Sequence, residues 1–158
     1  MKKLIITVAQ TGSVPTREKN PYAPLTPQEI VKDICDCYER GAAITHIHAR
    51  DENLQPSQDP KHFKAILELL DETGCPIIRQ LTTSGRIFKT FDTRAQVLTL
   101  KPQSASLTTG SVNFASFIYE NEPALIEYLA EIMFKSNIKP ELEIFDTGMI
   151  QNALALKK

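Results

Sequence analysis

The fold is decided by residues 26–51, which read TPQEIVKDICDCYERGAAITHIHARD. The first half predicts an amphipathic helix, because Thr26 and Glu29 can form a capping box at its start and Gly41 suits its end. The second half, residues 42–48, has the apolar character of a buried strand. A helix that leads directly into a strand is the repeating unit of an α/β protein.

The same unit recurs along the whole chain. Helices are expected to begin near Thr26, Asp59, Thr93, Asn121 and Thr147. Five successive strand and helix units predict one sheet of parallel strands. The strands are expected near residues 4–9, 42–48, 76–82, 104–108 and 140–145.

Composition narrows the classes of function. The 158 residues are 42% hydrophobic and 23% charged, as in an ordinary globular domain, and the net charge of -1 argues against a nucleic-acid partner. No apolar run reaches the roughly 18 residues of a membrane span, so no membrane partner is expected. The three cysteines lack metal or redox spacing, which favours reduced thiols and a cytoplasmic location.

Two histidines end the second predicted strand. Strand alternation places His46 and His48 on one face, where both rings can reach a single metal ion. Two histidines hydrogen-bonded in a polar pocket would give the same pattern. The carboxyl ends of parallel strands form the functional face of such sheets, which favours the metal. The remaining histidine, His62, is expected to be solvated in the first turn of a helix.

Two glutamates share a face of the fifth predicted strand. Glu141 and Glu143 alternate with Leu142 and Ile144, so both carboxylates are expected to point into the sheet's inner face. A buried carboxylate needs a partner or a function. We expect Glu141, nearer the start of the strand, to form an ion pair, and Glu143 to be the functional residue.

Polar turns follow the third and fourth strands. The segments 80–86 and 106–114 carry small hydroxyl residues and glycine. Such turns can donate hydrogen bonds to an anion, but they also suit a plain connection. After the second strand, Arg50 and Asp51 are expected to form a structural ion pair.

Taken in order, these motifs resemble the β-keto acid cleavage enzyme family, whose best-known activity is 3-keto-5-aminohexanoate cleavage. Each motif alone is weak, whereas the ordered set is specific. The resemblance covers essentially the whole chain, through residues 6–12, 20–30, 41–50, 80–83, 101–114 and 140–149.

The resemblance implies a TIM (β/α)8 barrel whose zinc ion is held by His46, His48 and a glutamate of a later strand. It implies a reverse-Claisen exchange, in which a β-keto acid and acetyl-CoA give acetoacetate and a new acyl-CoA. It also implies a cytoplasmic homo-oligomer, with lysine degradation as the known setting. The residues expected to line the keto-acid pocket are Thr82, Ser106, Thr108 and Glu143, with Glu143 also catalytic.

Four positions depart from the family pattern. Familiar members have Ser at the position of Thr82, and Thr and Asn at the positions of Ser106 and Thr108. They also have an acidic residue where this chain has Val14. These changes move hydroxyl groups and remove an amide and a carboxylate, so we expect a preference against amine-bearing keto acids.

A complete barrel needs about 250 residues, so residues 1–158 are expected to be the N-terminal portion of a longer barrel, truncated to about five strand and helix units. The truncated chain by itself is expected to be inactive. Two alternatives remain open at this point: another metal-dependent TIM-barrel hydrolase, and an inactive half-barrel. A requirement for acetyl-CoA separates the acyltransferase from a hydrolase.

Overall fold

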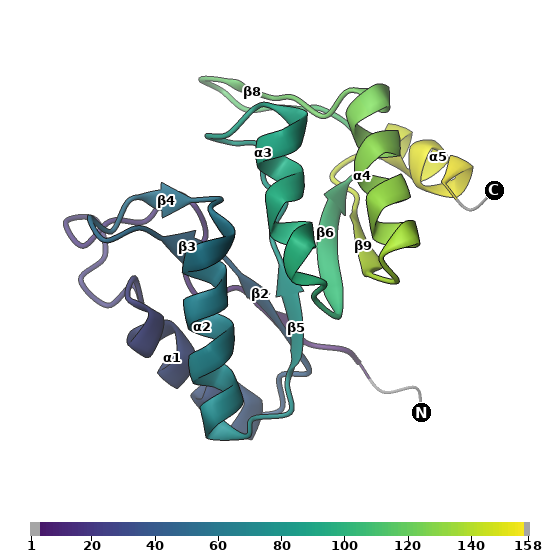
Figure 1. The fold of residues 1–158 in the computed structure, drawn as a ribbon. Helices are drawn as coiled ribbons and strands as arrows, with labels where there is room; N and C mark the ends of the chain where they lie inside the picture. Colours follow the sequence, from purple (N-terminus) through teal and green to yellow (C-terminus); the bar gives the residue numbers. More distant parts are fainter. Residues whose placement is uncertain (1–3, 157–158) are drawn as a thin grey trace.

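A computed structural model describes residues 4–156 of the chain, and five strands in it form one curled sheet (Figure 1). The strand order is β1-β2-β5-β6-β9, and each neighbouring pair is parallel, as predicted. The strands are β1 (Thr7–Val8), β2 (Ile44–Ile47), β5 (Ile78–Leu81), β6 (Ser104–Thr108) and β9 (Lys139–Glu143).

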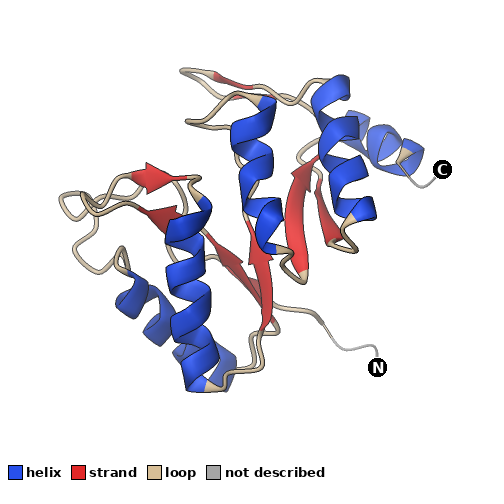
Figure 2. Cartoon of the chain, viewed as in Figure 1, coloured by secondary structure: helices blue, strands red, loops and turns tan. Residues whose placement is uncertain are grey.

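Helices connect the strands and lie along the outer face of the sheet (Figures 1 and 2). The strand order follows the chain without reversal, which is the winding of a (β/α)8 barrel and differs from an open doubly wound sheet. The prediction of a partial barrel is therefore confirmed for five units. The helices are α1 (Pro27–Glu39), α2 (Pro60–Thr73), α3 (Phe91–Ala95) with a 3₁₀ turn η1 (Gln96–Leu100), α4 (Pro123–Lys135) and α5 (Thr147–Ala155).

The helix boundaries follow from local chemistry. Thr26 and Glu29 form the predicted capping box, with each side chain accepting from the other's backbone N–H. Asp59 caps α2, and Gly74 ends it with φ 68°, a conformation that glycine adopts without strain. The third helix begins at Phe91, two residues before the predicted Thr93, because Thr90 supplies its cap.

The strands at the two edges differ from their expected extents. β1 is two residues long, although Ile6 extends the pairing by accepting from the N–H groups of Ala43 and Ile44. It pairs on one side only, so fewer hydrogen bonds hold its start. β9 ends at Glu143, two residues before the expected 145, because the chain turns toward Asp146, which caps α5.

Two antiparallel ribbons were not predicted. β3 (Ala49–Arg50) pairs with β4 (Pro56–Ser57), and β7 (Val112–Asn113) pairs with β8 (Ile118–Tyr119). Each ribbon lies in the connection that follows the carboxyl end of a central strand, β2 or β6. They are too short for period-two alternation to be visible in the sequence.

The expected ion pair of Arg50 and Asp51 is wrong. The Arg50 guanidinium instead donates to the backbone carbonyls of Gly12 and Pro15, in the connection between β1 and α1. Asp51 accepts from backbone N–H groups within its own turn. Arg50 thereby ties two of the connections around the carboxyl ends of the strands to each other.

The two faces of the sheet differ in chemistry. Ile47, Leu81 and Leu107 are buried on the face that packs against the helices. The side chains that alternate with them point to the inner face and are polar, among them His46, Gln80, Ser106 and Glu141. A polar inner face is expensive unless its groups have partners, so it marks the functional region.

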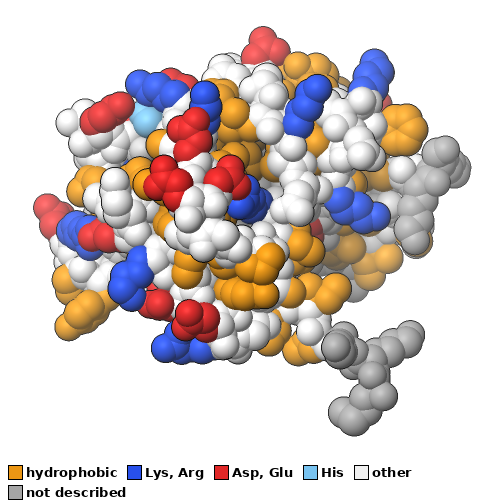
Figure 3. Space-filling view, turned by 60° about the horizontal axis from the view of Figure 1, so that its bottom comes forward, with side chains coloured by type: hydrophobic (Ala, Val, Ile, Leu, Met, Phe, Trp, Pro, Cys, Tyr) orange, Lys and Arg blue, Asp and Glu red, His pale blue; other side chains and the backbone are white. Residues whose placement is uncertain are grey.

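The charge on the visible surface of the described residues is mixed in sign. Acidic and basic side chains are interspersed on the face shown in Figure 3. No helix within residues 4–156 has the length and apolar character needed to cross a membrane. Large apolar side chains are exposed near both edge strands, for example Leu4 beside β1 and Phe145 after β9. The expected self-association remains a prediction.

The first prediction concerns Glu29, whose carboxylate accepts hydrogen bonds from Arg17 and from the N–H groups of Leu25 and Thr26. The Arg17 hydrogen bond, and then those from the backbone, lower the pKa of Glu29 from 4.5 to about 2. The folded state therefore binds this proton less well than the unfolded chain does. The stabilisation is complete above pH 4.5 and is lost as the pH falls toward 2.

Glu29→Gln should lower the free energy of unfolding by about 1 kcal/mol at pH 7, since both ion-pair partners are partly exposed and solvent screens them. Urea denaturation at a series of pH values measures the difference from wild type, which should shrink below pH 4.5. The exposed helix residue Glu127, substituted by Gln, is the control. A deficit that stays constant down to pH 2.5 would refute the assignment.

Candidate metal and substrate site

The carboxyl ends of the central strands surround a cavity of about 150 Å³. Four residues singled out in the sequence line it: His46, His48, Thr82 and Glu143. They come from β2, β5 and β9 or from the residues directly after them, so the parallel sheet brings them to one place. The other lining residues are Ser13, Ser84, Arg86, Phe114, Tyr119 and Phe145.

The two histidines that line this cavity are in direct contact. The distance between the Nε2 atoms of His46 and His48 is 3.2 Å, and the ring centroids are 5.0 Å apart with an interplanar angle of 65°. His46 lies within β2, and His48 follows directly after its last residue, Ile47. Strand alternation therefore produces the predicted convergence of the two rings.

The electrostatic environment keeps His48 neutral. Burial, and then the positive charges that His46 and Arg50 can carry, lower the pKa of His48 from 6.5 to about 3. At neutral pH this ring has no charge and retains one nitrogen lone pair. A metal ion needs such a lone pair, because only the neutral imidazole is a ligand.

The histidine pair fits part of a zinc site. Zinc is bound by imidazole nitrogen at about 2.0–2.1 Å, and two nitrogens 3.2 Å apart can both reach one ion at that distance. A catalytic zinc ion usually has three protein ligands. Within residues 4–156, no third His, Cys, Asp or Glu joins the pair in a cluster that could hold a metal. The pair therefore accounts for two ligands.

Glu143 is held by a neighbouring strand. Thr108, opposite it in the register of β6 and β9, donates its hydroxyl to Glu143 Oε2 at 2.5 Å. The Tyr119 hydroxyl lies 3.3 Å from that of Thr108. Thr108 does not line the cavity, so its contact with the site passes through Glu143.

The two hydroxyl residues Thr82 and Ser106 have different surroundings. The Thr82 hydroxyl accepts from the Ser84 N–H at 3.1 Å and lines the cavity, which leaves its proton for a ligand. Ser106 lies behind the cavity wall, where its hydroxyl accepts from the Thr83 N–H at 3.2 Å. Direct substrate binding by Thr82 remains a prediction that its position allows, and the position of Ser106 favours a supporting role.

Gln80 and Glu141 belong to the site, although the sequence did not indicate it. The Gln80 side chain is buried between polar groups of β2 and β9. Its Oε1 lies 2.5 Å from His46 Nδ1, and its Nε2 donates to Glu141 Oε2 at 2.7 Å. The expected ion pair of Glu141 is wrong, since its partner is the neutral amide of Gln80. Because Gln80 alternates with Thr82 along one strand, it shares that residue's face, and this was the available signal.

A buried arginine holds the connections around the cavity together. Arg94, at the end of α3, is 1% exposed. It donates to the carbonyls of Thr83 and Glu120 and to Asn121 Oδ1 at 2.8, 3.0 and 2.7 Å. Gly85 leaves the room for it, since a Cβ there would lie 2.6 Å from an Arg94 nitrogen. One side chain thus links the connections after β5 and β6.

A positive charge lies at the edge of the cavity. The Arg86 guanidinium is over the rings of Phe117 and Phe114, with 4.7 and 5.5 Å to their centroids. The two rings stack at 4.8 Å. The stacked rings hold the Arg86 guanidinium beside the histidines and Glu143. Among the ion pairs of the described residues, none involves Arg86. This positive charge suits an anionic ligand.

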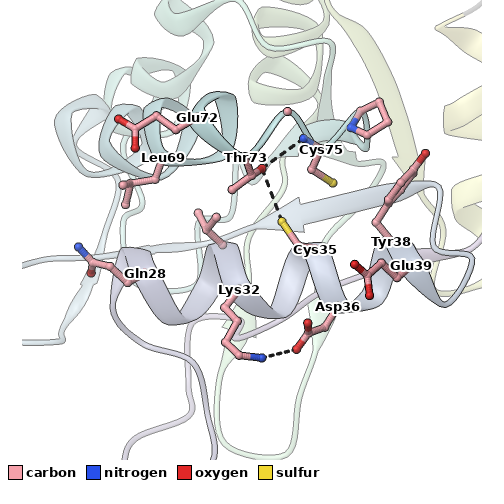
Figure 4. Close-up of a pocket in the computed structure, with 13 residues that line it drawn as sticks. Gln28, Lys32, Cys35, Asp36, Tyr38, Glu39, Leu69, Glu72, Thr73 and Cys75 are labelled. Atoms are coloured by element: carbon pink, nitrogen blue, oxygen red, sulfur yellow. Dashed lines mark hydrogen bonds and ion pairs between the residues drawn. The ribbon is translucent and has the colours of Figure 1, made fainter.

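A larger hollow of about 720 Å³ lies between α1 and α2 (Figure 4). Its lining includes Cys35, Thr73 and Cys75, which precede the amino end of β5 or lie on the helices. This is the end of the sheet remote from the histidines. Burial raises the pKa of the Cys75 thiol, which makes it a poor nucleophile. Size alone therefore does not indicate the functional site.

The third histidine is less solvated than expected. The His62 side chain is 13% exposed, and its ring contacts the Ser57 hydroxyl at 2.6 Å and Glu52 at 3.3 Å. The β4 ribbon covers it, an element that the sequence did not predict. His62 does not line the cavity and is a natural comparison for the paired histidines.

Comparisons with known proteins show which proteins this chain resembles. Residues 3–158 match the family model described as beta-keto acid cleavage enzyme. The chain is 41% identical to the 3-oxoadipate:acetyl-CoA acetyltransferase of Cupriavidus necator, over 98% of this chain and 54% of that protein. It is 38% identical to the 3-keto-5-aminohexanoate cleavage enzyme of Acetoanaerobium sticklandii, over 100% of this chain and 58% of that protein.

The chain thus spans little more than half the length of these two relatives. A similar fold occurs in the apo structure of ObcA, with a TM-score of 0.72 and 23% sequence identity. That match covers 86% of this chain and 33% of the other. At this identity the likeness concerns the fold alone.

Proposed function

Because the chain belongs to the beta-keto acid cleavage enzyme family, we propose that its protein exchanges acyl groups between a β-keto acid and acetyl-CoA. In this exchange the bond between the keto carbon and the α-carbon of the β-keto acid breaks. The acetyl group of acetyl-CoA takes the place of the original acyl group, which gives acetoacetate. The released acyl group leaves as a new acyl-CoA, so atoms and electrons balance without an external oxidant or reductant.

One observation supports this proposal most strongly. The neutral His48 and the ring of His46 converge at 3.2 Å in the same cavity that Glu143 lines. A metal ligand pair and a carboxylate are the groups that a keto acid requires for binding and proton transfer. The pair also lies at the carboxyl ends of the parallel strands, where barrel enzymes place their active-site residues.

We propose that His46 and His48 hold a zinc ion, with a further ligand from outside the described residues. When bound, zinc would polarise the carbonyl of the keto acid and help to neutralise its carboxylate. The chain's own residues orient the substrate around that position. Thr82 offers a hydroxyl proton to a substrate oxygen, and Arg86 contributes a positive charge at the cavity edge.

Glu143 is proposed to move the proton. Its carboxylate faces the cavity, and the Thr108 hydroxyl fixes one of its oxygens. The other oxygen is then directed toward a bound substrate, where it can accept a proton from the acidic carbon between the two carbonyl groups. Thr108 acts through Glu143, which explains how a residue outside the cavity wall can influence the reaction.

The substrate is proposed to lack an amine. Val14 follows Ser13, which lines the cavity, and no carboxylate occurs at position 14 to pair with an ammonium group. Thr82, Ser106 and Thr108 supply hydroxyl groups at the other three altered positions. The name of the Cupriavidus necator relative specifies 3-oxoadipate, a keto acid without an amine, which supports this direction.

Two further proposals concern the oligomeric state of the protein and its location. We propose that the protein self-associates, since the apolar side chains exposed beside β1 and β9 would be costly to leave in water. We also propose a cytoplasmic location, because all three cysteines are free thiols, as a reducing compartment allows.

The second prediction tests the reaction. The full-length protein that contains residues 1–158, assayed with zinc, acetyl-CoA and a β-keto acid, should form acetoacetate. In it, His46→Ala should lower kcat/KM by at least about 1000-fold, because loss of a metal ligand removes Lewis-acid assistance. His62→Ala is the matched control, since it removes an imidazole outside the cavity and should keep the rate within about twofold of wild type. Acetoacetate is measured together with thermal melting, which should change little in either variant.

Three results would contradict the proposal. Full activity of His46→Ala, or of a metal-free preparation, would exclude a metal role for the pair. Consumption of the keto acid without acetyl-CoA would favour a hydrolase. Absence of any turnover in the folded, zinc-loaded full-length protein would remove the proposed activity, whereas residues 1–158 alone are expected to be inactive.

The third prediction tests substrate choice. Val14→Glu restores a carboxylate beside the cavity and should raise kcat/KM for an amine-bearing β-keto acid relative to an amine-free one of equal length by up to about 5-fold, because a partly exposed ion pair contributes up to ~1 kcal/mol. Val14→Gln is the uncharged control. An unchanged ratio in Val14→Glu, or an equal change in Val14→Gln, would refute a role for charge at this position.

A further inference from the structure

A chain of three hydrogen-bonded side chains crosses the inner face of the sheet behind the histidine pair. His46 on β2 contacts Gln80 on β5, and Gln80 contacts Glu141 on β9. His46 and Gln80 are direct partners in the register of β2 and β5. Gln80 is 1% exposed, so its amide depends on neighbouring side chains for its hydrogen bonds.

The direction of each hydrogen bond follows from the chemistry of the end group. A carboxylate only accepts, so the Gln80 group that faces Glu141 at 2.7 Å must be its NH₂ group. The Gln80 oxygen then faces His46 Nδ1 at 2.5 Å, and an amide oxygen also only accepts. The His46 proton is therefore on Nδ1, and the Nε2 lone pair points toward His48.

We propose that Gln80 and Glu141 form a positioning relay that fixes the Nδ1–H tautomer of His46 and so presents its Nε2 lone pair to a metal ion. This inference rests on the proposed metal site and deepens it. Metal-binding histidines commonly donate their other ring nitrogen to an acceptor, which sets both tautomer and ring orientation. Here the acceptor is an amide whose orientation is set by a carboxylate two strands further along, on β9.

The relay makes the two histidines unequal. Within residues 4–156, the one side-chain hydrogen bond of His48 is to His46. With the His46 lone pair facing it, His48 must place its own proton on Nε2 when no metal is bound. His46 is thus preset for the metal, whereas His48 must move its proton to Nδ1 before it can bind.

The tautomers are measured directly by ¹⁵N NMR of the ring nitrogens in the metal-free chain. The sequence has three histidines, so assignment by single substitution is practical. In wild type, His46 should show a protonated Nδ1 and an unprotonated Nε2, and His48 should show the reverse. A His46 ring protonated on Nε2 would overturn the proposal without recourse to any variant.

Glu141→Gln is the decisive variant, because it keeps the size and shape of the side chain but replaces a carboxylate, which only accepts hydrogen bonds, with an amide. An amide at position 141 can donate as well as accept, so only the longer hydrogen bond from Gln80 Nε2 to Ser104 Oγ, at 3.4 Å, still favours one orientation of the Gln80 amide. The ¹⁵N shifts of His46 should then move toward the average of the two tautomers. Gln80→Leu should have the same effect, and Gln58→Leu, at another buried glutamine that does not contact His46, should leave the shifts unchanged.

Zinc affinity, measured by competition with a chelator, connects the relay to the metal. Glu141→Gln should weaken zinc binding by about 10-fold or more. Unchanged His46 shifts in Glu141→Gln and Gln80→Leu, or shifted tautomers with unchanged zinc affinity, would overturn the proposal. If zinc affinity depends on Gln80 and Glu141 as predicted but the wild type does not exchange acyl groups, the relay is supported and the proposed function is contradicted instead.

Discussion

The parallel register of β2, β5, β6 and β9 is the constraint on which the rest of the structure depends. It places His46 opposite Gln80, and Thr108 opposite Glu143. Because side chains alternate in each strand, one residue of slip would exchange these groups with the apolar set that packs under the helices. Burial of the leucines and isoleucines on the outer face therefore fixes the register of the strands. That register in turn places the polar side chains of the inner face next to one another.

The polar inner face is tolerated because most of its members have partners. Gln80 contacts both His46 and Glu141, and Thr108 contacts Glu143, so few polar groups are left unpaired in the interior. Hydrogen bonds between neutral donors and carboxylates also fix geometry, which a site for a metal and a keto acid requires. Around the rim, Arg50 and Arg94 bind backbone carbonyls of the connections, which preserves the cavity walls.

Much of this could be predicted from the sequence where the cause is local. The capping box of Thr26 and Glu29 and the alternation of His46 and His48 depend on residues a few positions apart, and both were recognised. The partner of Glu141 could not be identified in the same way, because Gln80 lies 61 residues away and reaches it only through the register of the strands. An ion pair was therefore expected in its place. The ribbon beside His62 was missed for a related reason, since its pairing joins short segments without a periodic pattern.

Zinc K-edge X-ray absorption of the stoichiometrically zinc-loaded protein tests the central claim most directly. The account predicts a first shell of nitrogen and oxygen at about 2.0–2.1 Å, with the multiple-scattering pattern of two imidazole rings. A sulfur shell at about 2.3 Å would mean that the cysteines between α1 and α2 bind the metal instead. That result, or a spectrum without imidazole scattering, would contradict the assignment of His46 and His48 as a metal pair.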